Sequence, residues 1–120
     1  MNIPVFPIIE LVDRYLIAEI KFQKTAKNLE EYNFYKNQIE QLDFFAIENL
    51  MQELKDIHLS IWELEKELKN GVEHNLSYKE IALRAIAIRD HNRNRISCKN
   101  NIAEKLNSLV KEFKQDHLSE

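Results

Sequence analysis

The eight residues 92–99, NRNRISCK, lie in the middle of the last long helix that the sequence predicts. One side of this helix is traced by positions that alternate by four and three residues: Ile81, Ala85, Ile88, Asn92, Arg95, Lys99, Ile102, Leu106, Leu109 and Phe113. This spacing is typical of a helix face that packs into a core. Three central members, Asn92, Arg95 and Lys99, are polar or charged, and burying unpaired charge is costly. These side chains therefore need partners, from the protein itself or from a ligand.

The composition is that of a small all-α domain. The chain has 120 residues, of which 31% are charged and 44% hydrophobic, a balance typical of amphipathic helices rather than of a disordered chain. It holds one Gly and two Pro, and both Pro lie within residues 1–7. Because tight turns use these two residue types, we expect few turns and few, long helices.

The charge balance and the start of the chain exclude several classes of protein. A net charge of −3 offers no general basic surface, so nucleic acid is not an expected partner. The apolar opening stretch is short and runs into Glu10 and Asp13, so we predict neither a signal peptide nor a membrane span. One cysteine, Cys98, excludes an internal disulfide and fits a reducing compartment. We expect a cytoplasmic protein without a membrane partner.

The apolar pattern predicts one helical domain over residues 1–114. The expected helices cover about residues 7–27, 29–69 and 77–114, followed by a frayed tail over residues 115–120. The second helix is expected to be continuous, and Asp43 marks the place of a break if it is interrupted. The predicted fold is all-α, a long antiparallel helical hairpin plus an N-terminal helix. Such a three- to four-helix bundle, with coiled-coil spacing along its helices, would be completed by self-association.

Several residues have the chemistry of helix ends. Pro7 suits the first position of the first helix, and Asn28 is expected to cap the second. Gly71 is expected to end the second helix as a left-handed residue. Ser77 and Glu80 form a capping box that opens the last helix.

The first helix holds an acidic counterpart to the polar trio. Asp13 falls within the apolar stripe of this helix, and Glu10 lies one turn before it. One interpretation is an internal salt-bridge network that sets helix register and orientation. The alternative is a pocket between the first and last helices, in which Asn92, Arg95 and Lys99 bind a phosphate or carboxylate. The candidate polar core or anion pocket therefore consists of these residues: Glu10, Asp13, Asn92, Arg95 and Lys99.

No catalytic motif, metal site or cofactor is predicted. Glu-x-x-Asp pairs occur in the chain, but no Glu-x-x-Glu that would complete a helical magnesium site. Cys98 has no base placed by sequence to activate it, so we expect an inert thiol. No histidine has a second His or a Cys at the spacing of zinc ligands: His58, His74, His91 and His117.

A basic stripe overlaps the polar trio. It consists of Arg84, Arg89, Arg93 and Arg95. No aromatic residue is interleaved with it, so a stacking platform for single-stranded nucleic acid is missing. We expect surface ion pairs with the acidic face of the second helix, which carries Glu63, Glu65 and Glu67. Trp62, on the same helix, is expected to anchor a core or an interface.

Three segments occur in an order that resembles a known family. ELVDR at residues 10–14 is followed by IxEIK at residues 17–21, IWELE occupies residues 61–65, and NxxRxxxKxxI occupies residues 92–102. In these segments the chain resembles a family of small uncharacterised bacterial helical proteins, a domain of unknown function. Arg93 departs from the pattern, which has Asp or Asn there. The resemblance implies a bacterial protein in the context of sugar transfer or surface polysaccharide, and no activity.

Two functions follow from this reading of the sequence. The first is a non-enzymatic oligomerisation or adaptor module with a polar network in its core, a homo-oligomer with a dimer favoured and with room for a protein partner. The alternative is a small enzyme or binding protein for an anionic metabolite, a nucleotide sugar or phosphate, held by the Arg/Lys/Asp cluster. Asp13 or Glu10 would then serve as acid or base, with His91 as an auxiliary.

Overall fold

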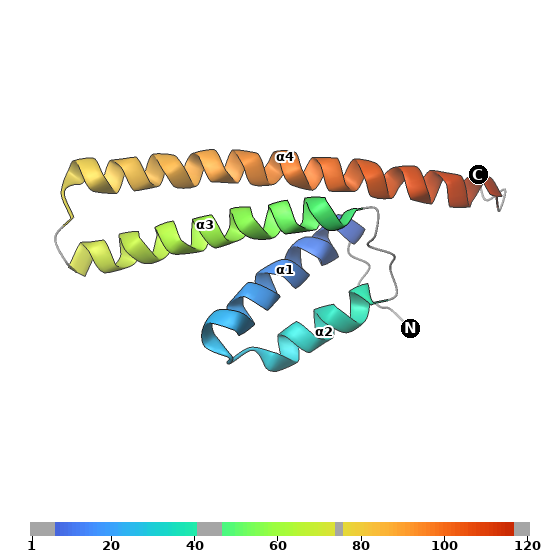
Figure 1. Ribbon diagram of the computed structural model, residues 1–120, viewed down its shortest axis with the longest axis horizontal. Coiled ribbons are helices and arrows are strands. Elements are labelled where there is room, and N and C mark those ends of the chain that lie inside the picture. The colour runs from blue at the N-terminus through green and yellow to red at the C-terminus, as the bar shows by residue number, and fades with distance from the viewer. Residues whose placement is uncertain (1–6, 41–46, 74–75, 117–120) are drawn as a thin grey trace.

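The computed structural model describes residues 7–40, 47–73 and 76–116. These residues form helices and no strand, which confirms the predicted all-α fold (Figure 1). The helices are α1 (Ile8–Thr25), α2 (Leu29–Ile39), α3 (Glu48–Glu73) and α4 (Tyr78–Asp116). Among the described helices, none is long and apolar enough to cross a membrane.

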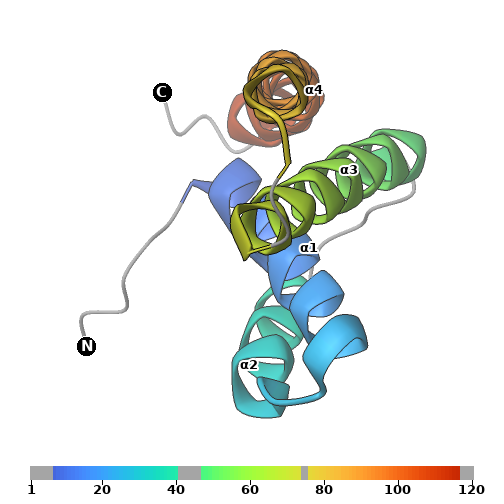
Figure 2. The same ribbon diagram turned by 90° about the vertical axis from the view of Figure 1, so that its left-hand side faces the viewer.

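The helices form an elongated hairpin with a smaller helix pair against its side. Helices α3 and α4 run antiparallel along each other, and α1 packs against both (Figure 1). Helix α2 packs against α1 alone, and Figure 2 shows it on the far side of α1 from the hairpin. The molecule measures 61 × 29 × 26 Å. We call the part where α1, α3 and α4 meet the junction.

The hairpin extends beyond α1 at the end where α3 passes into α4. Figure 1 shows this end, coloured yellow, as two helices with no third helix beside them. We call it the arm and define it as residues 67–73 of α3 together with residues 76–86, which lead into α4 and form its start. Because only two helices pack there, the arm can bury one side of each helix at most.

The core lies in the junction. Its buried residues come from α1, from the start of α3 and from the middle of α4: Val12, Leu16, Ile47, Leu54, Cys98, Ile102 and Leu106. Ile102 and Leu106 belong to the predicted stripe of the last helix, whereas Ala85 of that stripe is exposed in the arm. Among the stripe residues whose burial the structure describes, the fully buried ones therefore lie where α1 covers the hairpin.

The continuous second helix is a wrong prediction. Helix α2 ends at Ile39 and α3 begins at Glu48, and the chain reverses direction between them (Figure 1). Ile39 and Ile47 are both buried, so each helix end packs its own apolar residue. The break lets α2 fold back along α1, where the Tyr32 ring stacks on Phe22 with centroids 5.2 Å apart. The break predicted near Asp43 itself lies outside the described residues.

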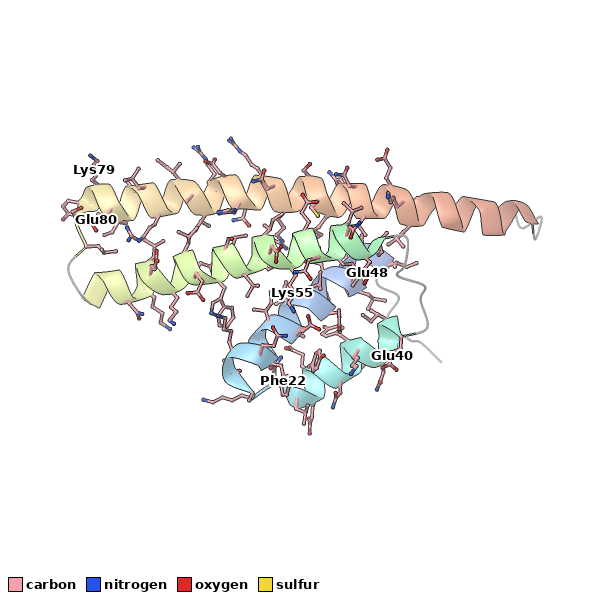
Figure 3. The ribbon with its side chains drawn as sticks, in the orientation of Figure 1. Phe22, Glu40, Glu48, Lys55, Lys79 and Glu80 are labelled. Carbon is pink, nitrogen blue, oxygen red and sulfur yellow. The ribbon has the colours of Figure 1, made fainter. Side chains whose placement is uncertain are left out.

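The predicted helix ends are partly right. Ser77 and Glu80 make the capping box: the Glu80 N–H donates to Ser77 Oγ over 3.1 Å, and the Ser77 N–H donates to Glu80 Oε1 over 3.4 Å. Figure 3 shows Glu80 at the start of α4. Gly71 does not end a helix, because α3 continues to Glu73; a helix tolerates a glycine near its end at a cost of about 1 kcal/mol. Helix α4 likewise runs past the predicted residue 114, to Asp116.

The residues at the ends of α1 and at the start of α2 make different contacts from those predicted. Pro7 lies just before α1, as its N-cap, and its carbonyl accepts the Glu10 N–H over 2.9 Å. Ala26 ends α1 with a left-handed φ of 56°. Asn28 is the N-cap residue of α2, but its side chain makes no capping bond. Instead its amide donates to the Ala18 carbonyl over 3.0 Å, which ties the link back to α1.

Candidate functional site

The candidate site is centred on Asp13, in the junction. Among the described residues Asp13 is the only buried charged one, with an exposure of 3%. Its Oδ2 accepts a hydrogen bond from an Arg95 terminal nitrogen over 3.2 Å and lies 3.5 Å from Lys99 Nζ. Its Oδ1 lies 2.7 Å from His58 Nε2. One carboxylate of α1 therefore joins α3 to α4.

Glu10 extends this cluster by one helical turn. Its carboxylate accepts a hydrogen bond from Lys99 Nζ over 3.0 Å. Lys99 thus lies between Glu10 and Asp13, the two acids that the sequence predicted as partners of the polar trio. Two acidic side chains, Glu10 and Asp13, form ion pairs with two basic side chains, Arg95 and Lys99. The charges of the cluster therefore compensate one another within the protein.

The surroundings of Asp13 favour its ionised form. Burial alone would raise its pKa, because a carboxylate loses hydration in the interior. The hydrogen bonds and charges of His58 and Arg95 act against burial and lower the pKa of Asp13 to about 2, from an ordinary 3.8. Asp13 is therefore a fixed negative charge at neutral pH, and it is poorly suited to serve as a general acid there.

His58 is the member of the cluster that sequence reasoning missed. It lies on α3, four residues after Leu54 and three before Ile61, both of which are buried. That spacing places His58 on the apolar side of α3, which was the available signal. His91, the predicted auxiliary, is not part of the cluster. It lines a different groove between α3 and α4, together with Asn94 and Ser97.

A cleft of about 310 Å³ opens beside the cluster, where α1 diverges from the hairpin. Ile17 and Ile20 line it from α1, and Ile61 and Trp62 line it from α3. Polar side chains line it from two helices: His58 and Glu65 from α3, and Asn92 and Arg95 from α4. The cleft therefore combines apolar walls with four polar or charged side chains.

Two polar side chains of the cleft keep unused hydrogen-bonding capacity. Asn92, predicted as part of the site, makes no hydrogen bond to any residue that the structure describes, and its amide is open to solvent. Arg95 donates from one terminal nitrogen to Asp13, while its Nε is buried without an acceptor. Its other terminal nitrogen is solvent-accessible and has no partner within the described ranges. Asn92 is thus a cleft residue and not a member of the salt-bridge cluster.

A second polar cluster also joins α1 to α3. Lys55 of α3 pairs with Glu19 of α1, and the Tyr15 hydroxyl donates to the same carboxylate over 2.8 Å; Figure 3 shows Lys55 where α3 crosses α1. Burial would raise the pKa of Glu19, but the bonds from Lys55 and Tyr15 lower it. Burial and the contact with Glu19 raise the pKa of Tyr15. Both charged groups of this cluster, the Lys55 ammonium and the Glu19 carboxylate, have partners. Such mutual pairing is typical of a structural contact.

The prediction that the basic stripe pairs with the acidic face of α3 is right for Arg84 and wrong for Arg89 and Arg95, whereas the buried thiol fits its predicted inert role. Arg84 pairs with Glu67 of α3 over 3.0 Å, Arg89 pairs with Asp90, and Arg95 pairs with Asp13. The Cys98 thiol donates to the Leu50 carbonyl over 3.4 Å. Burial, with a smaller contribution from Glu53, raises its pKa to about 11, so little thiolate forms at neutral pH. In the described part of the chain no three His, Cys, Asp or Glu side chains converge on a metal position.

Comparison with models of protein families, with curated proteins and with solved structures found no match to this chain. The resemblance of three segments to a family of bacterial helical proteins therefore stays a prediction.

Proposed function

We propose that this protein is a non-enzymatic helical module that associates with a second copy of itself through the outer side of α4 in the arm, and that the pair serves as an adaptor. The observation that carries this proposal is a group of exposed apolar side chains there. Tyr78 is 93% exposed, Leu83 56% and Ile86 45%. Apolar groups gathered at one place on a surface are typical of a protein interface.

The position of these side chains on the helix supports an interface. Successive residues of an α-helix are about 100° apart, so Ile86 lies nearly opposite Arg84, which bonds to Glu67 of α3. Ile86 therefore points away from α3, and Leu83, about 100° from Arg84, points to one side of α4. Figure 3 shows Lys79, in the same stretch, extending away from the hairpin. A second copy that packed on this side would give the arm the additional helices that it lacks.

The compensated cluster in the junction also supports a structural role. Arg95 and Lys99 already bond to Asp13 and Glu10, so their charges are compensated within the protein, and Arg95 keeps one terminal nitrogen open. An enzyme or binding protein for a nucleotide sugar or phosphate needs cations free to hold phosphate oxygens. That alternative function has less support for this reason. We retain the cytoplasm as the proposed location, since a single buried thiol suits a reducing compartment.

The solution mass tests self-association. Light scattering or sedimentation equilibrium should give twice the chain mass of 14.3 kDa at micromolar concentration. Replacing Leu83 and Ile86 together by glutamate should shift the protein to the monomer, because two buried charges would oppose each other in the dimer. Phe34→Glu is the matched control, since Phe34 is equally exposed but lies on α2. A monomeric wild type, or a dimer that the double variant leaves intact, would refute this interface.

A further inference from the structure

The cleft beside Arg95 has the composition of a small-molecule site. Pockets that hold small ligands are mostly apolar, contain a few convergent polar groups and begin at about 300 Å³. This cleft has about that volume, apolar walls from Ile17, Ile61 and Trp62, and polar atoms of Arg95 and Asn92, which lie one turn apart on α4. It lies in the junction, so it is independent of the proposed interface on the arm.

The unused donors of the cleft define the chemistry of its ligand. The accessible terminal nitrogen of Arg95 and the amide of Asn92 both lack a partner among the described residues, and both can donate. We propose that the cleft binds a small apolar monocarboxylate, whose carboxylate accepts hydrogen bonds from Arg95 and Asn92 and whose apolar part lies against Trp62 and the isoleucines.

The neighbouring charges limit the ligand to one negative charge at most. Arg95 already shares its guanidinium with Asp13, and Glu65 adds a second carboxylate at the cleft. These two acids disfavour a phosphate, which carries more charge than a carboxylate. The planar guanidinium matches a carboxylate, and a neutral ligand would forgo the charge-assisted bond. A flat or branched apolar group completes the fit, because Ile17, Ile20 and Ile61 offer dispersion contacts.

Trp62 provides a direct probe of the cleft. It is the single tryptophan of the chain and lines this cleft, so its fluorescence and its indole N–H resonance report on occupancy. Titration with phenylacetate should change both signals saturably, with half-saturation at millimolar concentration or below. Phenylacetamide, which has the same shape without the charge, should bind about tenfold more weakly or not at all. Inorganic phosphate should leave the signals unchanged.

Two variants separate binding from folding. Asn92→Leu removes a donor that has no partner in the described protein, so it should fold normally and bind phenylacetate several-fold more weakly. Arg93→Leu, one position along and exposed, is the matched control and should bind like the wild type. Saturable binding that Asn92→Leu weakens and Arg93→Leu does not would support the proposal. No saturable change with phenylacetate, equal binding of phenylacetamide, or an unchanged Asn92→Leu would overturn it.

Discussion

Asp13 in the junction and Glu67 in the arm each bond to an arginine of α4, yet the two carboxylates lie in different surroundings. The distances are nearly the same, 3.2 Å for Asp13 with Arg95 and 3.0 Å for Glu67 with Arg84. The Asp13 side chain is 4% exposed and that of Glu67 53%. Three helices meet around Asp13, whereas only two run past Glu67 (Figure 1).

This difference shows that burial, more than distance, decides what an ion pair contributes. An exposed pair exchanges its partner for water at little cost. A buried pair has no such substitute, and removing one member leaves the other charged and without hydration. The fold therefore depends on α1 bringing Asp13 to the hairpin, and it does not depend in the same way on the pair in the arm.

The largest effect is expected from removing the buried carboxylate. Asp13→Ala leaves Arg95, Lys99 and His58 without their shared acceptor and should lower the free energy of unfolding by about 3 to 5 kcal/mol. Glu67→Ala, the matched change in the arm, should cost less than about 1 kcal/mol. Urea denaturation followed by circular dichroism measures both. Equal losses for the two variants would show that the contrast between junction and arm is wrong.

A smaller effect is expected from pH. Because the pKa of Asp13 is lowered to about 2 in the fold, its contribution to stability is complete above its ordinary value of 3.8 and is lost as the pH falls through about 2. A shift of this size corresponds to about 2 kcal/mol. The difference in unfolding free energy between the wild type and Asp13→Asn should therefore shrink over this range. If the difference in unfolding free energy did not depend on pH, the fold would not favour the ionised form of Asp13 over the protonated form.

The sequence predicts features that arise from local patterns or from charge matching. The capping box of Ser77 and Glu80 depends on residues one turn apart, and the structure contains it. The sequence predicts that Asp13 pairs with Arg95 and Lys99, because Asp13 lies on the apolar stripe of the first helix and the two basic residues lie on that of the last helix. Charged side chains in such positions need partners. That reasoning requires no knowledge of how the helices are arranged.

The features that the sequence does not predict depend on tertiary packing. In the sequence, the apolar positions keep helical spacing across the break between α2 and α3, so the spacing alone does not show that the chain turns back there: Tyr35, Ile39, Leu42, Ala46, Leu50 and Leu54. His58 was overlooked because a half-apolar side chain suits either a surface or an interior. The cleft arises from the divergence of α1 from the hairpin, and a sequence pattern contains no information on that angle.

The most direct test of the account is the energetic coupling between Asp13 and Arg95. A double-mutant cycle compares the unfolding free energies of the wild type, Asp13→Ala, Arg95→Ala and the double variant. If Asp13 locks α1 to the hairpin, the coupling should be about 1.5 to 3 kcal/mol, and the same cycle on Glu67 and Arg84 should give about 0.2 to 1 kcal/mol. A coupling between Asp13 and Arg95 no larger than that of the pair in the arm would contradict the account.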